Sequence, residues 1–258
     1  GRPLSQEEFA RLDYRVMRHA FECQNQLGRL CDEVIYQNDL AARLQADGLT
    51  ARTEVPVTVT HSDFSKSYSL DLVVEEAGIY ELKTTVKLGG EHEAQLLNYL
   101  FLCGHHHGKL INFRPARVES RFVNTTLTPV ERRDIQILTE RWQEEEATDR
   151  ILRTSLTGML QDWGGWLDLA LYTEGVVHFL GGEERVISDV PLARADFCLG
   201  RQRFCLLSPN AGFRLTALTE GIEEYERHLN SLLRLTALRV IQWVNLARRQ
   251  VQFVTMVR

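Results

Sequence analysis

Alternating apolar and polar residues between positions 53 and 84 predict three consecutive β-strands. In the first, 53–61, valines alternate with polar residues. A turn at 63–66 leads to a second run, SLDLVV (69–74), in which leucine and valine flank a single aspartate. A third β-prone run, 79–84, follows the turn signal at 75–78. The pattern therefore predicts an antiparallel meander of three strands.

Helical spacing predicts two helices before this meander and one after it. Ser5-Gln-Glu-Glu has the sequence of a capping box and opens the first helix. A second helix is predicted over 26–46, with its stop signal at Asp47-Gly48. The residues expected on the buried side of that helix are Leu27, Leu30, Val34 and Ala41. A third helix over 92–102 precedes strands at 109–113 and 118–124, and the histidine-rich segment 104–108 is interpreted as a loop.

The pattern of residues along the chain changes after residue 125, so we predict a core over 1–125 and an α+β region over 126–258. Thr128-Pro129 has the sequence of a helix start. Helices are expected at 130–146, 149–161 and 219–235, and strands at 175–180, 186–190, 203–207, 238–246 and 250–257. Gly181-Gly182 is interpreted as a hairpin signal. The last hairpin would suit a sheet edge shared between subunits.

Asp71, Glu81 and Lys83 are the candidate chemical group of the meander. If the two strands pair, Glu81 and Lys83 project from one face and Asp71 lies near them. Two carboxylates beside each other repel unless a cation neutralises them. Mg²⁺ or Mn²⁺ prefers oxygen ligands, and the backbone carbonyl of Leu82 would add one. Lys83 would position or deprotonate the attacking water, or hold a phosphate. Taken alone, this spacing is more often a solvated strand face.

Together with further motifs, these three residues resemble the signature of a known family. Asp71, the Glu81-Leu82-Lys83 triplet and Gln95-x-x-x-Tyr99 together resemble the core signature of the PD-(D/E)XK nuclease superfamily. The similarity is to its RecB-type, lambda-exonuclease-like branch. The segment GRLCDEVIY (28–36) resembles the ExxY element of the GxxExxY group, and HEAQLLNYL (92–100) is similar to that group's helix. Leu30 stands where the group's glycine would fall. The resemblance covers roughly 21–123.

The resemblance implies roles for residues on the two helices. Glu33 would coordinate the ion directly or through water, although a lone helix glutamate is more often solvated. Tyr36 would either pack, with its hydroxyl tied to the backbone, or orient Glu33 or a phosphate. Gln95 and Tyr99 would order the terminal phosphate of the substrate or the nucleophilic water. On the polar stripe of the later helix, His92 is a further substrate-binding candidate.

Arginines and tryptophans outside these motifs are weaker candidates for nucleic-acid contact. Arg114 and Arg117 lie near the connection between two predicted strands, where they would touch a phosphate backbone, although surface arginines usually do not. Trp163 and Trp166 would stack on bases, but packing is the favoured interpretation.

Composition limits the class of protein. A formal net charge of −5 argues against coating nucleic acid by bulk electrostatics, so any contact with DNA must be local. The five cysteines form no CxxC pair, which argues against a zinc knuckle or a disulfide framework and favours a cytoplasmic protein. No run is long enough to cross a membrane, and no signal sequence or anchor is expected.

The sequence thus predicts an α/β nuclease core, a mixed sheet flanked by helices, followed by a small α+β region. The predicted activity is Mg²⁺- or Mn²⁺-dependent hydrolysis of single- or double-stranded DNA, with an exonuclease favoured by resemblance. A homo-oligomer is also expected by resemblance. The α+β region would grip substrate or assemble subunits. The alternative is a catalytically silent nucleic-acid-binding or regulatory protein that keeps the fold.

Overall fold

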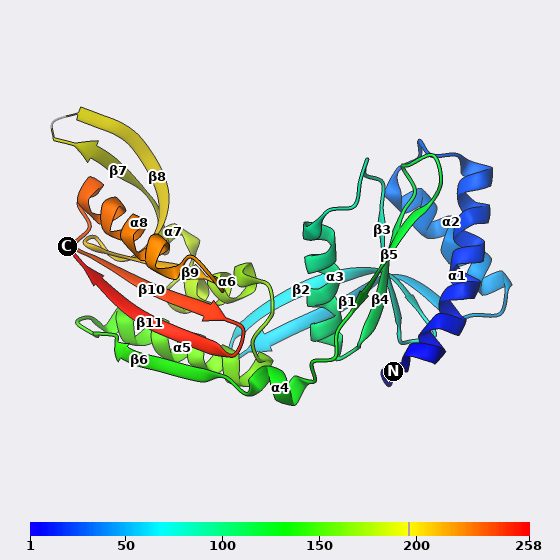
Figure 1. Cartoon of the computed structure of the whole chain (residues 1–258), viewed down its shortest axis with the longest axis horizontal. Coiled ribbons are helices and arrows are strands. Elements are labelled where there is room, and N and C mark those ends of the chain that lie inside the picture. The colour runs from blue at the N-terminus through cyan, green and yellow to red at the C-terminus, as the bar shows by residue number, and fades with distance from the viewer. Residues whose placement is uncertain (196) are drawn as a thin grey trace. The chain divides into compact units, whose positions relative to one another are not determined.

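The computed structural model describes residues 1–195 and 197–258, which form two compact units. Unit 1 comprises Gly1–Thr60 and Ser65–Pro129, and unit 2 comprises His61–Phe64 and Val130–Arg258. The elements are labelled in Figure 1. None of the helices in the described residues is long and apolar enough to span a membrane. All five cysteines are free thiols.

Unit 1 is built on a mixed sheet with strand order β1-β2-β3-β4-β5. Its strands are β1 (Ala51–His61), β2 (Phe64–Val74), β3 (Gly78–Lys83), β4 (His107–Asn112) and β5 (Glu119–Asn124). β3 pairs antiparallel with β2 and parallel with β4, and β5 is antiparallel to β4. The parallel pair requires a crossover, which α3 (Gly90–Cys103) supplies. The predicted α/β class with a mixed sheet is confirmed.

Helices cover both faces of this sheet. α1 (Gln6–Leu27) and α2 (Glu33–Ala46) lie on one side and α3 on the other (Figure 1). Leu40 of α2 packs in one apolar cluster with Leu72 and Tyr80, whereas Leu96 of α3 packs in a second cluster with Ile79. β3 therefore has core on both faces, which explains why five of its six residues are buried.

The predicted helix over 26–46 was wrong in its first part. α1 continues to Leu27 and ends at Gly28, whose φ of 72° requires a residue without a side chain, and α2 begins only at Glu33. Leu30 falls in the loop between them and is 80% exposed, and Val34 is 54% exposed, so neither lies on the buried side as expected. The capping box at Ser5 and the stop at Asp47 are confirmed.

Unit 2 is an α+β unit with a six-stranded sheet of order β6-β11-β10-β9-β8-β7. Its strands are β6 (Gln136–Arg141), β7 (Ile187–Arg194), β8 (Phe197–Ser208), β9 (Ala211–Thr216), β10 (Val240–Ala247) and β11 (Gln250–Val257). The helices of this part of the chain are α4 (Pro129–Arg133), α5 (Ala147–Trp163), α6 (Leu169–Phe179), α7 (Glu183–Val186) and α8 (Ile222–Leu235).

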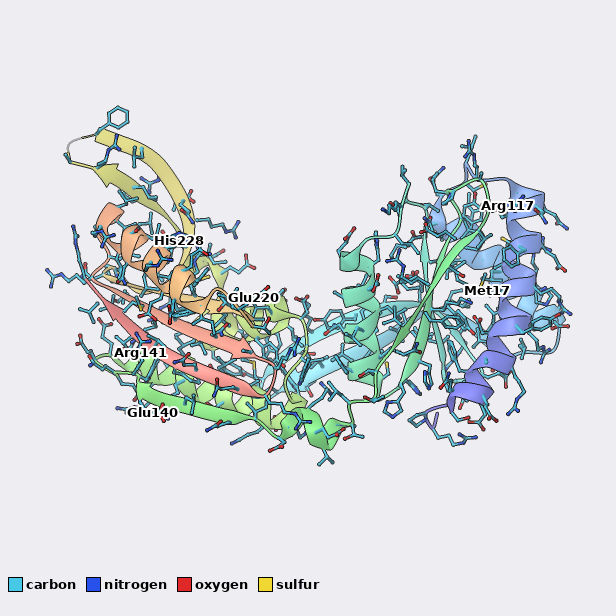
Figure 2. All side chains as sticks on the ribbon, in the orientation of Figure 1. Met17, Arg117, Glu140, Arg141, Glu220 and His228 are labelled. Atoms are coloured by element: carbon cyan, nitrogen blue, oxygen red, sulfur yellow. The ribbon has the colours of Figure 1, made fainter. Side chains whose placement is uncertain are left out.

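Both faces of the second sheet are covered as well. Leu229 of α8 packs with Trp243 and Val254, while the neighbouring strand positions Val244 and Phe253 point to the opposite face and are also buried. Arg141 of β6, labelled in Figure 2, donates to Glu226 of α8 across 3.0 Å.

Three predictions for this region were wrong. The helix over 130–146 stops at Arg133, because 136–141 pairs as β6 in parallel with β11. The strand over 175–180 is the end of α6, and Gly181-Gly182 separates two helices instead of turning a hairpin. The last hairpin is not a sheet edge, since β11 lies between β6 and β10. The first and third errors concern strands whose place depends on a partner distant in sequence.

Candidate active site

Asp71, Glu81 and Lys83 lie together on β2 and β3. Leu72 is paired with Tyr80, and continuing this antiparallel register by one residue sets Asp71 beside Glu81. Nζ of Lys83 lies 2.7 Å from Oε1 of Glu81 and 3.9 Å from Oδ2 of Asp71. Two carboxylates and one ammonium therefore share a small volume on the side of the sheet that α3 covers.

Burial makes this group electrostatically unusual. The Glu81 side chain is only 1% exposed, and burial, followed by repulsion from Asp71, raises the pKa of Glu81 to about 8. The pKa of Asp71 is also raised, chiefly by burial, while Lys83 opposes the shift. Although burial lowers the pKa of Lys83, the charge and hydrogen bond of Glu81, with the charges of Asp71 and Glu33, together offset it, so the pKa is raised and the ammonium form is favoured. Lys83 lies against both carboxylates, and its single charge balances one of them.

Asp71 is held in place through its backbone and its side chain. Its Oδ2 accepts a hydrogen bond from the backbone amide of Leu82 across 2.8 Å. Nε2 of the buried Gln37 donates both to the carbonyl oxygen of Asp71 and to Oε1 of Glu54. Ser69 donates to the other oxygen of Glu54 across 2.6 Å. These bonds tie β1 and α2 to the strand that carries Asp71.

Gln37 and Glu54 were missed in the sequence. Gln37 lies one turn after Glu33 on α2, so the i, i+4 spacing was a usable signal. Glu54 gave no such signal, because its φ of 50° is an irregularity within an otherwise alternating strand. Hydrogen bonds from Ser69 and Gln37 lower the pKa of Glu54 and keep it ionised.

Glu33 is the first residue of α2, and it lies within the electrostatic reach of the group on β3. Burial raises its pKa, Lys83 opposes this shift, and Asp71 adds to it. A hydrogen bond with the backbone of Thr84, directly after β3, also lowers its pKa. The structure thus brings four of the predicted site residues to one place: Glu33, Asp71, Glu81 and Lys83.

Tyr36 and Arg114, predicted as substrate-binding residues, both donate hydrogen bonds to backbone carbonyls, and for Tyr36 this is the packing alternative of the prediction. Tyr36 is fully buried, stacks on Phe113 at 4.5 Å between centroids, and donates its hydroxyl to the carbonyl of Gly28. Arg114 donates to the carbonyls of Arg29 and Cys31 and to that of Thr84. Both side chains are occupied in fixing the loop before Glu33, because its carbonyls would otherwise lack partners.

The candidate residues on α3 make two separate hydrogen bonds, one between Gln95 and Tyr99 and one between His92 and Gly89. Nε2 of Gln95 donates to the hydroxyl of Tyr99 across 3.1 Å. Burial raises the pKa of Tyr99, and the charges of Glu81 and Asp71 add to this shift. Nδ1 of His92 accepts from the backbone amide of Gly89 and caps the start of α3. Arg117, labelled in Figure 2, is exposed between β4 and β5.

The carboxylates of β2 and β3 fit a divalent cation by their chemistry. Oε2 of Glu81 is buried and has no hydrogen-bond partner in the described part of the chain, so its chemistry suits a metal ligand. Within residues 1–195 and 197–258, however, no group of three or more His, Cys, Asp or Glu side chains is arranged to hold a metal. The proposed cation site therefore depends on Asp71 and Glu81, and Glu33 does not form a three-residue metal site with them.

Comparison with known proteins agrees with this geometry. Residues 10–123 match the family model of the PD-(D/E)XK nuclease superfamily. The match covers the sheet and the helices that carry the site, so this part of the chain is similar to a nuclease superfamily. Nucleases of this superfamily generally use divalent metals. The mixed sheet flanked by helices is consistent with that core.

The other comparisons add little to this nuclease core. No curated protein matches the chain. One solved structure that matches, "Crystal structure of SSO0001", shares 22% sequence identity with the chain at a TM-score of 0.29. The match covers 45% of this chain and 64% of that chain. This likeness is too distant to support an argument.

Proposed function

We propose that the protein is a metal-dependent deoxyribonuclease that hydrolyses DNA phosphodiester bonds at Asp71, Glu81 and Lys83. The observation that carries the proposal is the approach of Lys83 to both carboxylates, beside the unpartnered Oε2 of Glu81, inside the region that matches a nuclease family. A solvated strand face would leave these side chains exposed, and they are not.

Asp71 and Glu81 would hold Mg²⁺ or Mn²⁺ together with the backbone carbonyl of Leu82, and Glu33 would complete the shell. When bound, such a cation supplies charge neutralisation at the phosphate and acidifies a water molecule. Oxygen donors on two adjacent strands suit these hard ions. The orientation of Asp71 by Leu82 and Gln37 would fix the position of the cation.

Lys83 would hold the scissile phosphate or align the attacking water as an ammonium group. Its raised pKa favours this role over proton abstraction, because a general base must be deprotonated near neutral pH. Gln95 and Tyr99 would order the terminal phosphate or the water from α3. Because these two side chains would order a terminal phosphate, and because the family resemblance implies the same activity, we favour an exonuclease.

The test is cleavage of labelled single- and double-stranded DNA by the full chain with Mg²⁺, with Mn²⁺ and with EDTA. We expect metal-dependent products from the wild type and a loss of at least about a hundredfold in Asp71→Asn and Lys83→Met. Glu76→Gln and Lys87→Met are matched controls, because both wild-type side chains are exposed in unit 1.

Each result has a defined meaning. Terminal mononucleotides would establish an exonuclease, and internal fragments an endonuclease. Cleavage that survives both Asp71→Asn and Lys83→Met would refute this active site. Binding of DNA without cleavage under any metal would favour a silent nucleic-acid-binding protein.

A further inference from the structure

Unit 2 contains a cavity that the nuclease chemistry does not use. Its volume is about 260 Å³, and it is formed where the Trp163–Leu167 turn meets the turn between β10 and β11. The apolar part of its wall is formed by Leu160, Leu246 and Val251. The wall also contains the aromatic ring of Trp166 and the cationic side chain of Arg248. This volume is just below the roughly 300 Å³ at which pockets for drug-sized ligands begin, so it suits one ring system.

Trp166 and Arg248 both line this cavity, and the guanidinium lies over the indole ring. Cζ of Arg248 lies 5.9 Å from the centroid of the Trp166 ring. Trp166 is 36% exposed, and Arg248 is exposed as well. An indole ring and a guanidinium at one cavity are groups that stack on a base and attract a phosphate.

The backbone of both residues has an unusual conformation. Trp166 has a φ of 73° and Arg248 a φ of 50°, a region that residues with a side chain rarely adopt. The backbone directly before Trp166 is held in place, because Tyr172 donates to the carbonyl of Gly164 and Arg132 donates to that of Gly165. At Arg248 the positive φ is that of the two-residue turn between β10 and β11, so the constrained backbone is at Trp166.

We propose that this cavity binds one unpaired base of the nucleic acid, stacked on Trp166, with Arg248 beside the adjoining phosphate. The proposal rests on the proposed function for the class of ligand, since the match to a nuclease family is what makes nucleic acid the expected partner. It assigns unit 2 a substrate-gripping role.

The experiment measures binding of a fluorescein-labelled single-stranded 20-mer to the full chain in EDTA, where metal-dependent cleavage does not occur. Trp166→Gly removes the ring and relieves the positive φ, so the variant should fold. We expect it to weaken binding roughly tenfold or more, the loss typical of one stacked base. Trp166→Phe should restore part of the affinity. Arg248→Gly should also weaken binding, whereas Arg249→Gly, at the next position of the same turn, should not.

Two further probes identify the ligand. An abasic 20-mer keeps the phosphates but offers no base, so its affinity should not change in Trp166→Gly. Unlabelled deoxyadenosine monophosphate should compete only far more weakly than the oligonucleotide. If the mononucleotide binds as tightly as the oligonucleotide, the cavity belongs to a free nucleotide and the proposal is overturned.

Other outcomes separate this proposal from the nuclease proposal. If wild-type protein cleaves DNA but Trp166→Gly binds it normally, the cavity proposal fails and the nuclease proposal stands. If no cleavage occurs but binding depends on Trp166, the reverse holds. Loss of binding only in Phe197→Ala, at the exposed start of β8, would also overturn the proposal, because the contact would then lie on the β7–β8 hairpin.

Discussion

The side-chain amide of Gln37 donates to the backbone carbonyl of Asp71, and so α2 directly braces the strand that carries a candidate catalytic carboxylate. The same amide donates to Glu54 across 2.8 Å. Because Gln37 is buried, these bonds are shielded from competition by water. Gln37 is therefore a positioning residue of the proposed site, and it is the basis of the first prediction.

Gln37→Ala should lower cleavage by roughly 10- to 100-fold, as loss of a partner behind a metal ligand commonly does. The loss should appear as a higher Mn²⁺ concentration for half-maximal rate, because a misplaced Asp71 binds the cation less well. Titration of activity with Mn²⁺ measures this effect. Gln45→Ala, on the same helix, is the control, since Gln45 bonds Ala51 and not Asp71. An unchanged Mn²⁺ requirement would contradict the positioning role.

Glu81→Gln should stabilise the metal-free protein at pH 8 while abolishing cleavage. The unfolded chain releases the Glu81 proton near its ordinary pKa of 4.5, whereas the folded chain keeps it until about pH 8. Folding therefore loses stability as pH rises between these values, and a neutral glutamine removes that loss. Thermal unfolding in EDTA at pH 5 and pH 8 measures the effect. Equal pH dependence in wild type and variant would show that Glu81 is not the responsible group.

Addition of Mn²⁺ should raise the melting temperature of the wild type at pH 8 and leave that of Glu81→Gln nearly unchanged. A cation that binds only the folded protein stabilises it by mass action, and the variant lacks one carboxylate ligand. Thermal unfolding with increasing Mn²⁺ is the measurement. Equal shifts in both proteins would place the bound ion elsewhere.

Asp47 should contribute to stability above about pH 4 and lose that contribution as pH falls toward 2. Hydrogen bonds from Arg15, followed by His19, lower its pKa to about 2 from the ordinary 3.8. The unfolded chain therefore takes up this proton first, which favours unfolding in acid. Acid unfolding of Asp47→Asn should be less steep between pH 4 and 2 than that of the wild type. Asp32→Asn, at an exposed position before α2, should behave like the wild type.

Tyr36→Phe should lower the free energy of unfolding by about 1–2 kcal/mol, because the hydroxyl bonds to Gly28 and Cys31 are lost while the stack on Phe113 remains. Urea unfolding measures this change. Tyr14→Phe, at a 76% exposed tyrosine of α1, should change stability little. If the variant instead has a raised KM for DNA and unchanged stability, Tyr36 contributes to substrate binding.

The sequence by itself determined most elements of unit 1, apart from the start of α2, and the candidate residues on β2 and β3. Strand alternation and a tight turn between Asp71 and Glu81 are local properties, so spacing along the chain was sufficient to bring these side chains together. The capping box at Ser5 and the stop at Asp47 are local for the same reason. The approach of Lys83 to Glu81 followed from two positions on one strand face.

Only the tertiary structure decided which candidates are free to act. Tyr36 and Arg114 match the pattern expected of functional residues, yet packing and distant carbonyls occupy both. β6 became a strand because β11, more than a hundred residues later, offers it a hydrogen-bonding edge. The cavity at Trp166 likewise joins turns far apart in sequence. Contacts of this kind depend on the folded arrangement of distant segments, which no local pattern encodes.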